Sequence, residues 1–120
     1  MVSQYLSEVK ELVKTKLTES IGNSNPVEKS MAYSAIAESK MVRAGLIFAS
    51  SEMSSSLEHD SVITLAASIE LMHTYSLIHD DLPCMDDDDI RRNQPSNHVK
   101  YGEANAVLSG DALQALSYEI

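Results

Sequence analysis

Residues 79–93 read His-Asp-Asp-Leu-Pro-Cys-Met-Asp-Asp-Asp-Asp-Ile-Arg-Arg-Asn, and the rest of the chain is organised around this stretch. It contains six aspartates, and two arginines follow after Ile90. Two carboxylates ~4 Å apart repel each other by roughly 4 kcal/mol at an effective dielectric constant near 20, and a bound divalent cation is the usual reason for such crowding. Guanidinium groups match phosphate groups with two donors per contact. The stretch therefore predicts a site for Mg²⁺ and a diphosphate.

An acidic run can also be a solvated loop or a disordered tail. This run lies between two apolar segments and itself contains Leu82, Met85 and Ile90, which a solvated tail does not need. A calcium loop of the EF-hand type fails on spacing. Counted from Asp81, its third and fifth positions are Pro83 and Met85, which offer no side-chain oxygen.

Composition indicates one small all-α domain over residues 1–120. The 120 residues include only four glycines and three prolines, and the net charge of −9 argues against nucleic acid or an anionic membrane as a partner. Cys84 is the single cysteine, so a disulfide framework is excluded and a cytoplasmic setting fits. We expect no signal peptide, since the first ten residues contain no apolar run, and no membrane span, since no run of 18 apolar residues occurs.

Apolar residues recur at spacings of three and four, which predicts a series of helices. Asn25 and Pro26 are expected to cap and open the second helix, and Asp60 to cap the fourth after a polar linker over 54–60. Pro83 disfavours helix at the residue before it, so Asp86 should return on a loop towards the helix end. The expected helices cover residues 3–17, 26–37, 38–54, 61–81 and 103–120.

Within these helices, spacing places several polar side chains together. Lys40 and Arg43 are three residues apart and would share a face of the helix expected over 38–54. His73 precedes Asp80 by two turns and would point into the same cavity, whereas His79 is expected to be structural. Gly110 is expected to let the last helix pack closely or bend.

The segment from Asp80 to Asp86 resembles the first aspartate-rich motif, D-D-x-x-x-x-D, of the trans-prenyl diphosphate synthases. Arg91 and Arg92 stand where that family has its arginine pair, and the flanking sequences from His73 to Asp80 and from Pro95 to Leu113 match too. The sequence is most similar to the bacterial farnesyl diphosphate synthases, with plant-type geranylgeranyl diphosphate synthases next. The resemblance implies the N-terminal part of the isoprenoid-synthase helical bundle.

The resemblance also implies an activity, which is Mg²⁺-dependent condensation of dimethylallyl or geranyl diphosphate with isopentenyl diphosphate to give farnesyl diphosphate. A geranylgeranyl product is the alternative. Metal would be held by Asp80, Asp81 and Asp86, and the allylic diphosphate by Arg91. Isopentenyl diphosphate would be held by Lys40, Arg43, His73 and Arg92. Tyr75, five residues before the first aspartate, would form the floor of the product pocket, and Asp87, Asp88 and Asp89 would be outer ligands or solvated.

The sequence departs from the family pattern in three ways. Where the family carries a Gly-Gly-Lys-Arg-Leu-Arg-Pro-like motif, this chain has Glu38, Ser39, Met41 and Ala44 at four of the positions, and Asn93 replaces a glycine after the arginine pair. The family's second aspartate-rich motif, far downstream, does not occur. We therefore expect the N-terminal part of a synthase that is homodimeric at full length, and no turnover by residues 1–120 alone. The other hypothesis is a non-catalytic helical partner of a full-length synthase.

Overall fold

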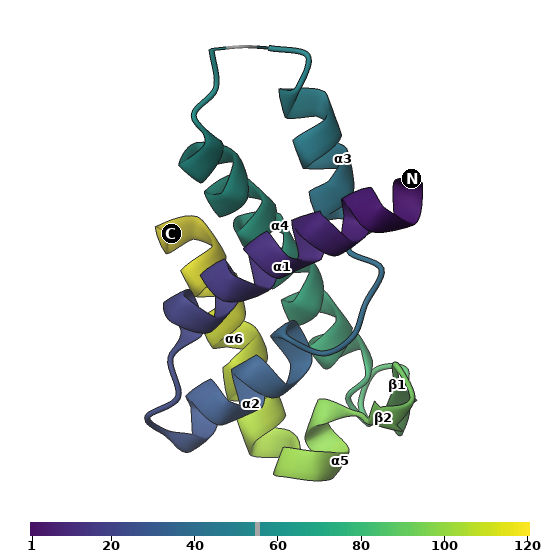
Figure 1. The fold of residues 1–120 in the computed structure, drawn as a ribbon. Helices are drawn as coiled ribbons and strands as arrows, with labels where there is room; N and C mark the ends of the chain where they lie inside the picture. The colour runs from purple at the N-terminus through teal and green to yellow at the C-terminus, as the bar shows by residue number, and fades with distance from the viewer. Residues whose placement is uncertain (55) are drawn as a thin grey trace.

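The computed structural model describes residues 1–54 and 56–120, and it consists of helices with one very short hairpin (Figure 1). Residue 55, in the linker predicted over 54–60, lies outside the described residues. The all-α prediction is confirmed. The elements are α1 (Val2–Ile21), α2 (Pro26–Ala35), α3 (Val42–Ser51), α4 (His59–Asp80), β1 (Ile90–Arg91), β2 (Gln94–Pro95), α5 (Asn97–Tyr101) and α6 (Glu103–Glu119).

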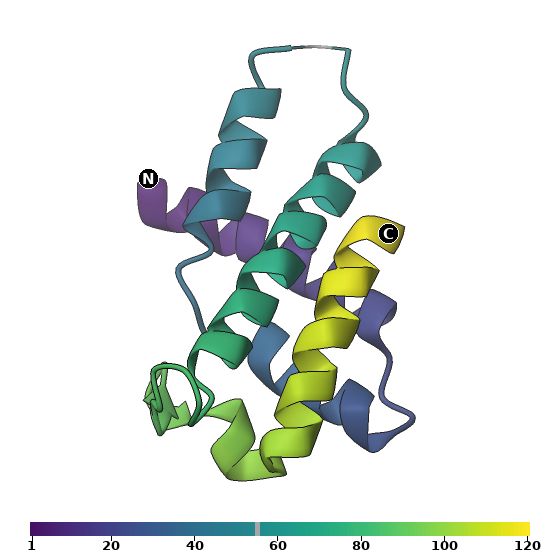
Figure 2. The ribbon, with the colours of Figure 1, turned by 180° about the vertical axis from the view of Figure 1, so that it is seen from behind.

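Helix α4 is the centre of the bundle. It runs beside α6 in both views, α3 packs next to its first half, and α1 crosses it (Figures 1 and 2). Its fully buried residues include Ala66, Ala67 and Leu71, whose small or branched side chains let the neighbours approach. Burial all round the helix, which its apolar sequence predicts, is not found. Leu65 is 54% exposed and Ile69 is 38% exposed, because the neighbouring helices cover only part of the circumference of α4.

Helix α4 also has the length and the mean hydropathy, 1.3 over its most apolar window, of a membrane-spanning helix. Core helices of globular proteins pass the same test. Its packing against α1, α3 and α6 gives it the position of a core helix.

The sequence predicts N-caps for α2 and α4, and the structure confirms only the one for α2. Asn25 caps α2, since its side chain accepts a hydrogen bond from the Glu28 amide at 2.9 Å, and Pro26 opens the helix. Asp60 is not a cap, because α4 begins at His59, two residues before the predicted start, and Glu58 takes the cap position without a side-chain bond. Asp60 lies in the first turn, where a negative charge still suits the helix dipole.

The helix expected from residue 38 begins only at Val42. Met41 before it has a left-handed backbone with φ of 48°, which an α-helix excludes. Lys40 therefore precedes the helix, and the expectation that it shares a helical face with Arg43 is wrong.

The hairpin after the aspartates pairs Arg91 with Gln94 and turns through Arg92 and Asn93. Both turn residues have positive φ, 53° and 63°, which is the requirement of a type I′ two-residue turn. Asparagine tolerates this conformation better than most residues, so Asn93 can stand where the family has glycine. Neither the hairpin nor the short helix α5 was predicted from the sequence.

A buried polar network anchors this region to the bundle. Asn97 donates to the Ser30 carbonyl at 2.9 Å and to the Ser34 hydroxyl at 2.8 Å, and it accepts from the Ser30 hydroxyl at 2.8 Å. Ser109 of α6 donates to the Ser30 hydroxyl at 2.7 Å. The network therefore fixes the segment after the arginine pair against both α2 and α6.

Gly110 of α6 lies directly against His79 of α4, so close packing is the reason for this glycine. The His79 imidazole contacts the Val107 carbonyl at 3.0 Å, and a Cβ on Gly110 would clash with the ring. His79 thus joins α4 to α6, which confirms the structural role predicted for it.

Gly110→Ala is expected to lower the free energy of unfolding by roughly 1 kcal/mol. An alanine inside a helix is normally about 1 kcal/mol better than glycine, but overpacking costs about 1–3 kcal/mol. Urea denaturation measures the difference. In a His79→Ala background the clash is absent, so the same substitution should become stabilising. A destabilisation of equal size in both backgrounds would contradict this explanation.

Candidate functional site: a carboxylate loop beside a basic cleft

The loop after α4 folds back onto the helix end, as the position of Pro83 predicts. The Asp86 amide donates to the Asp80 carbonyl at 2.8 Å, and the Asp88 amide donates to the Asp81 carbonyl at 3.1 Å. Asp80 and Asp86 are both exposed. Asp80 and Asp86 are six residues apart in sequence, but a backbone hydrogen bond joins them directly, and both side chains lie at the surface.

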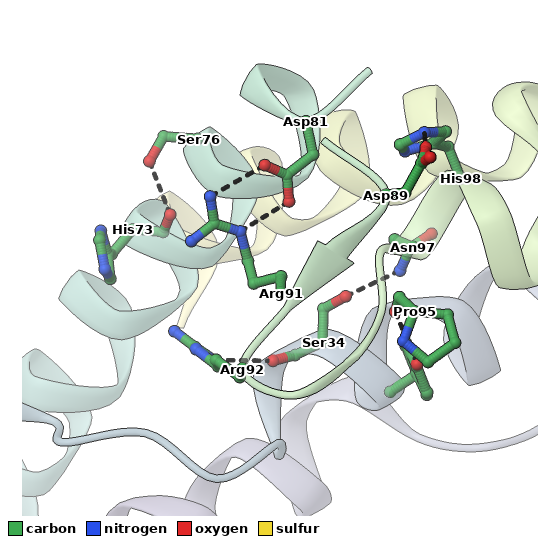
Figure 3. Close-up of polar contacts among 11 residues, drawn as sticks. Ser34, His73, Ser76, Asp81, Asp89, Arg91, Arg92, Pro95, Asn97 and His98 are labelled. Carbon is green, nitrogen blue, oxygen red and sulfur yellow. Dashed lines mark hydrogen bonds and ion pairs between the residues drawn. The ribbon is translucent and has the colours of Figure 1, made fainter. Parts of the chain in front are cut away.

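Asp81 differs from its two neighbours, because it is only 2% exposed and its carboxylate is already bound by Arg91 (Figure 3). Arg91 Nε donates to one oxygen at 2.6 Å and Nη2 donates to the other at 2.9 Å. The hydrogen bond with Asp81, ahead of any other effect, raises the pKa of Arg91. Two residues that the sequence assigns to metal and to diphosphate therefore bind each other in this structure.

The described residues bring three potential ligand atoms within 4.8 Å of one another at Asp87, Asp89 and His98, and not at Asp80, Asp81 and Asp86. His98 Nε2 lies 4.0 Å from Asp89 Oδ1 (Figure 3). Asp87 and Asp89 are exposed, in keeping with the solvated position expected for them. No local sequence pattern indicated His98 as a ligand, because only the hairpin brings it back to the aspartates.

Asp80 and Asp86 nevertheless suit Mg²⁺ in chemistry. They offer carboxylate oxygens alone, they are exposed, and their backbones are joined. Mg²⁺ keeps several waters and is commonly bound by one or two carboxylates together with substrate phosphates. The predicted pair is therefore compatible with a metal that arrives with a diphosphate.

A cleft of about 670 Å³ adjoins this loop and collects the basic residues. All five predicted substrate-binding residues line it, namely Lys40, Arg43, His73, Arg91 and Arg92. Lys10 of α1, which sequence reasoning missed, lines it too. Five cationic side chains face two carboxylates, Glu38 and Glu70, in a chain whose net charge is −9. The cleft is thus a local positive site suited to an anion.

Within the cleft, His73 lies next to Arg43, with 3.4 Å between His73 Nε2 and Arg43 Nη1. Burial, followed by the charges of Arg43, Arg92 and Arg91, lowers the pKa of His73. His73 therefore stays neutral at pH 7 and can contribute a hydrogen bond without a further charge. Arg92 donates to the Ser34 carbonyl at 3.3 Å, which holds its side chain at the edge of the cleft (Figure 3).

The two carboxylates of the cleft have different surroundings. Glu38 is exposed and pairs with Lys14 of α1 at 2.9 Å, so part of its charge is neutralised outside the cleft. Glu70 is only 5% exposed, and its Oε1 accepts a hydrogen bond from the Ala44 amide at 3.1 Å. Burial raises the pKa of Glu70, against the hydrogen bond from Ala44 and the charges of Arg43 and Arg92, which lower it.

Glu70→Gln is expected to change how stability depends on pH. Because the folded pKa of Glu70 is raised, the folded protein holds this proton to higher pH than the unfolded chain does. The free energy of unfolding therefore loses a contribution as pH rises from about 4.3, the ordinary glutamate value, through the raised value. Relative to wild type, the glutamine variant should gain stability over that window in urea denaturation series.

Glu28→Gln is the matched control for this measurement. Hydrogen bonds from Ser24 lower the pKa of Glu28, so its contribution to stability is lost as pH falls. The difference between this variant and wild type should slope in the opposite direction. Parallel slopes for the two variants would contradict the assignment for Glu70.

The comparison with known families decides what kind of protein holds this site. The family model for polyprenyl synthetases matches residues 24–120. The chain belongs to the polyprenyl synthetase family.

Individual polyprenyl synthetases give the same result. The chain is 48% identical to a farnesyl diphosphate synthase of Escherichia coli K12 over 97 residues, which are 81% of this chain and 32% of that protein. It is 45% identical to a geranylgeranyl diphosphate synthase of Cyanophora paradoxa over 96% of this chain and 39% of that protein. The crystal structure of an FPP/GFPP synthase from Zymomonas mobilis superposes with a TM-score of 0.92 at 35% identity, over 99% of this chain and 45% of the other. The chain thus spans about a third to two fifths of the length of these curated relatives.

Tyr75, the residue that the family resemblance assigns to product length, is half-buried on α4. Its ring lies edge to face with His79, with 5.2 Å between the ring centroids, and it packs against the core. His79 in turn contacts α6, so Tyr75 is supported near the α4–α6 contact. Its role in product length stays a prediction.

Proposed function

We propose that this chain supplies the first aspartate loop and the basic cleft of a Mg²⁺-dependent prenyl transferase. The reaction joins an allylic diphosphate, dimethylallyl or geranyl, to isopentenyl diphosphate and gives farnesyl diphosphate. One observation carries the proposal. Two exposed carboxylates, Asp80 and Asp86, are brought together at the end of α4 beside a cleft that collects five cationic side chains.

In this proposal the residues of the chain bind and orient two anionic substrates. Asp80 and Asp86 hold Mg²⁺, which when bound neutralises charge on the departing diphosphate. Arg91 contacts that same diphosphate. Isopentenyl diphosphate is held by Lys40, Arg43, His73 and Arg92. The allylic carbon–oxygen bond breaks, the double bond of isopentenyl diphosphate attacks the allylic carbon, and a proton is lost.

The assignment of Asp81 is revised. Both of its oxygens accept from Arg91 and its side chain is buried, so it is poorly placed to meet a metal in solvent. We propose that Asp81 orients Arg91 towards the diphosphate, while metal binding falls to Asp80 and Asp86. A guanidinium fixed at Nε and Nη2 keeps Nη1 for a further contact.

A chimera tests the proposed function. Residues 1–120 are joined to the remainder of the E. coli farnesyl diphosphate synthase, in place of the region they match. The chimera is expected to convert isopentenyl and dimethylallyl diphosphates to longer products only when Mg²⁺ is present. A folded chimera without turnover would instead favour the non-catalytic partner, a hypothesis supported by the altered residues at 38, 39, 41 and 44.

Tyr75→Ala in the same chimera is expected to shift products towards C20. Five residues along a helix place Tyr75 ~7.5 Å from Asp80, and loss of the ring would open space for a longer hydrocarbon. Tyr75→Phe keeps the ring and is expected to keep a C15 product. Chromatographic separation of dephosphorylated products measures both. An unchanged product distribution in the alanine variant would remove Tyr75 as the determinant.

A further inference from the structure

Glu70 connects the central helix to the start of α3. Among residues 61–79 it is the one acidic or basic residue apart from histidine, and its side chain is buried at the contact with Ala44. Helix α3 has no side-chain cap of its own, since Met41 stands at the cap position. The amides of the first helical turn need an acceptor, and a carboxylate there also matches the helix dipole. Glu70 supplies that acceptor from a different helix.

The hydrogen bond to Ala44 also restrains the residues that precede it. Arg43 is the neighbouring residue in the first turn of α3. Lys40 lies just before the helix, next to Met41, whose left-handed backbone costs energy in a non-glycine residue. On its own helix, Glu70 is one turn before His73, which in turn contacts Arg43 at 3.4 Å. Glu70 therefore lies where the start of α3 and helix α4, which both line the cleft, contact each other.

We infer that Glu70 is a positioning residue for the diphosphate cleft, which acts by holding segment 38–43 so that Lys40 and Arg43 face His73. The inference rests on the proposed function, because it gives the cleft a diphosphate to bind. Glu70 does not need its charge for this task. It needs an oxygen that reaches the Ala44 amide, and a negative charge beside five cations would if anything weaken anion binding.

Two conservative variants separate the effect of side-chain length at Glu70 from the effect of its charge. Glu70→Gln keeps an oxygen at the same distance and removes the charge, whereas Glu70→Asp keeps the charge and shortens the side chain by one methylene. Calorimetric titration of the chain with inorganic diphosphate without Mg²⁺ should give a Kd within about 3-fold of wild type for the glutamine variant. It should give a Kd about 10-fold weaker for the aspartate variant, a change of about 1.4 kcal/mol.

Hydrogen exchange at the Ala44 amide, followed by NMR, gives a second readout. Protection should persist in Glu70→Gln and fall in Glu70→Asp. Thr74→Val is the matched control, since Thr74 is buried one turn away and donates to the Glu70 carbonyl at 2.8 Å. It should lower the melting temperature without changing diphosphate affinity per folded molecule.

The outcomes distinguish this inference from the proposed function. Wild-type chain that binds no diphosphate would overturn the proposed function and the role of Glu70 together. Wild-type binding with an unaffected aspartate variant and a weakened glutamine variant would show that charge, and not position, matters at Glu70. That result would overturn the inference alone and leave the proposed function standing.

Discussion

Asp80→Ala or Asp86→Ala is expected to weaken Mg²⁺-dependent diphosphate binding on the order of 100-fold or more. Loss of residues that merely support metal ligands typically costs 10–100-fold in affinity, and loss of a ligand should cost at least as much. Without Mg²⁺ the effect of these substitutions on diphosphate affinity should reverse. Removing a carboxylate near the cleft removes repulsion, so diphosphate alone should bind as well as before or better. Calorimetry with and without Mg²⁺ measures both effects.

Asp88→Ala is the matched control for these variants. It lies in the same loop, it is exposed, and it makes the same change in net charge. Its effect on Mg²⁺-dependent binding should stay within about 3-fold, since an exposed charge that is not itself a metal ligand is screened by salt and water. Equal losses in all three variants would mean that the loop attracts Mg²⁺ by its overall charge, and the assignment to Asp80 and Asp86 would fail.

Arg91→Ala should be the most destabilising single substitution in the site, lowering the free energy of unfolding by about 3 kcal/mol. Removing one partner of a buried ion pair costs about 3–5 kcal/mol, because the other charge is left buried and unpaired. We expect the lower end of this range, since Asp81 is 2% exposed but Arg91 is 35% exposed. Urea denaturation at pH 7 gives the value.

Two further variants test the cause. Arg92→Ala removes the same charge from the neighbouring position but only one hydrogen bond, to a carbonyl, and should cost about 1 kcal/mol. Adding Asp81→Asn to Arg91→Ala removes the stranded charge and should restore part of the loss. If the Arg91 and Arg92 variants are equally stable, the ion pair with Asp81 contributes little to the fold.

Sequence reasoning succeeded where the deciding interactions are local. Pro83 ends the helix and sends Asp86 back towards Asp80, and Asn25 with Pro26 opens α2. Each of these outcomes depends on residues within about six positions, and their backbone preferences are known from residue type alone. The gathering of Lys40, Arg43, His73, Arg91 and Arg92 in one cleft followed from the family resemblance, and not from any local pattern.

It failed where a distant partner contributes to the structure. The first turn of α3 is bonded through the Ala44 amide to Glu70, 26 positions away, and the helix begins four residues later than the sequence predicted. The pairing of Asp81 with Arg91 depends on the hairpin that returns Arg91 to the helix end. A signal for Glu70 was present, because a lone acid within an apolar helix must find a partner when it is buried.

The Asn97 network has a consequence for the order in which the molecule acquires its structure. Its hydrogen bonds join residues that are 67 and 79 positions apart. Closing such long loops is slow, because the chain must lose conformational entropy before the stabilising bonds can form. The aspartate loop needs only local contacts, whereas the segment after the arginine hairpin is anchored only when Ser30 of α2 meets Asn97 and Ser109 of α6. In a nascent chain, the carboxylates would therefore be in place before the cations that are to work beside them.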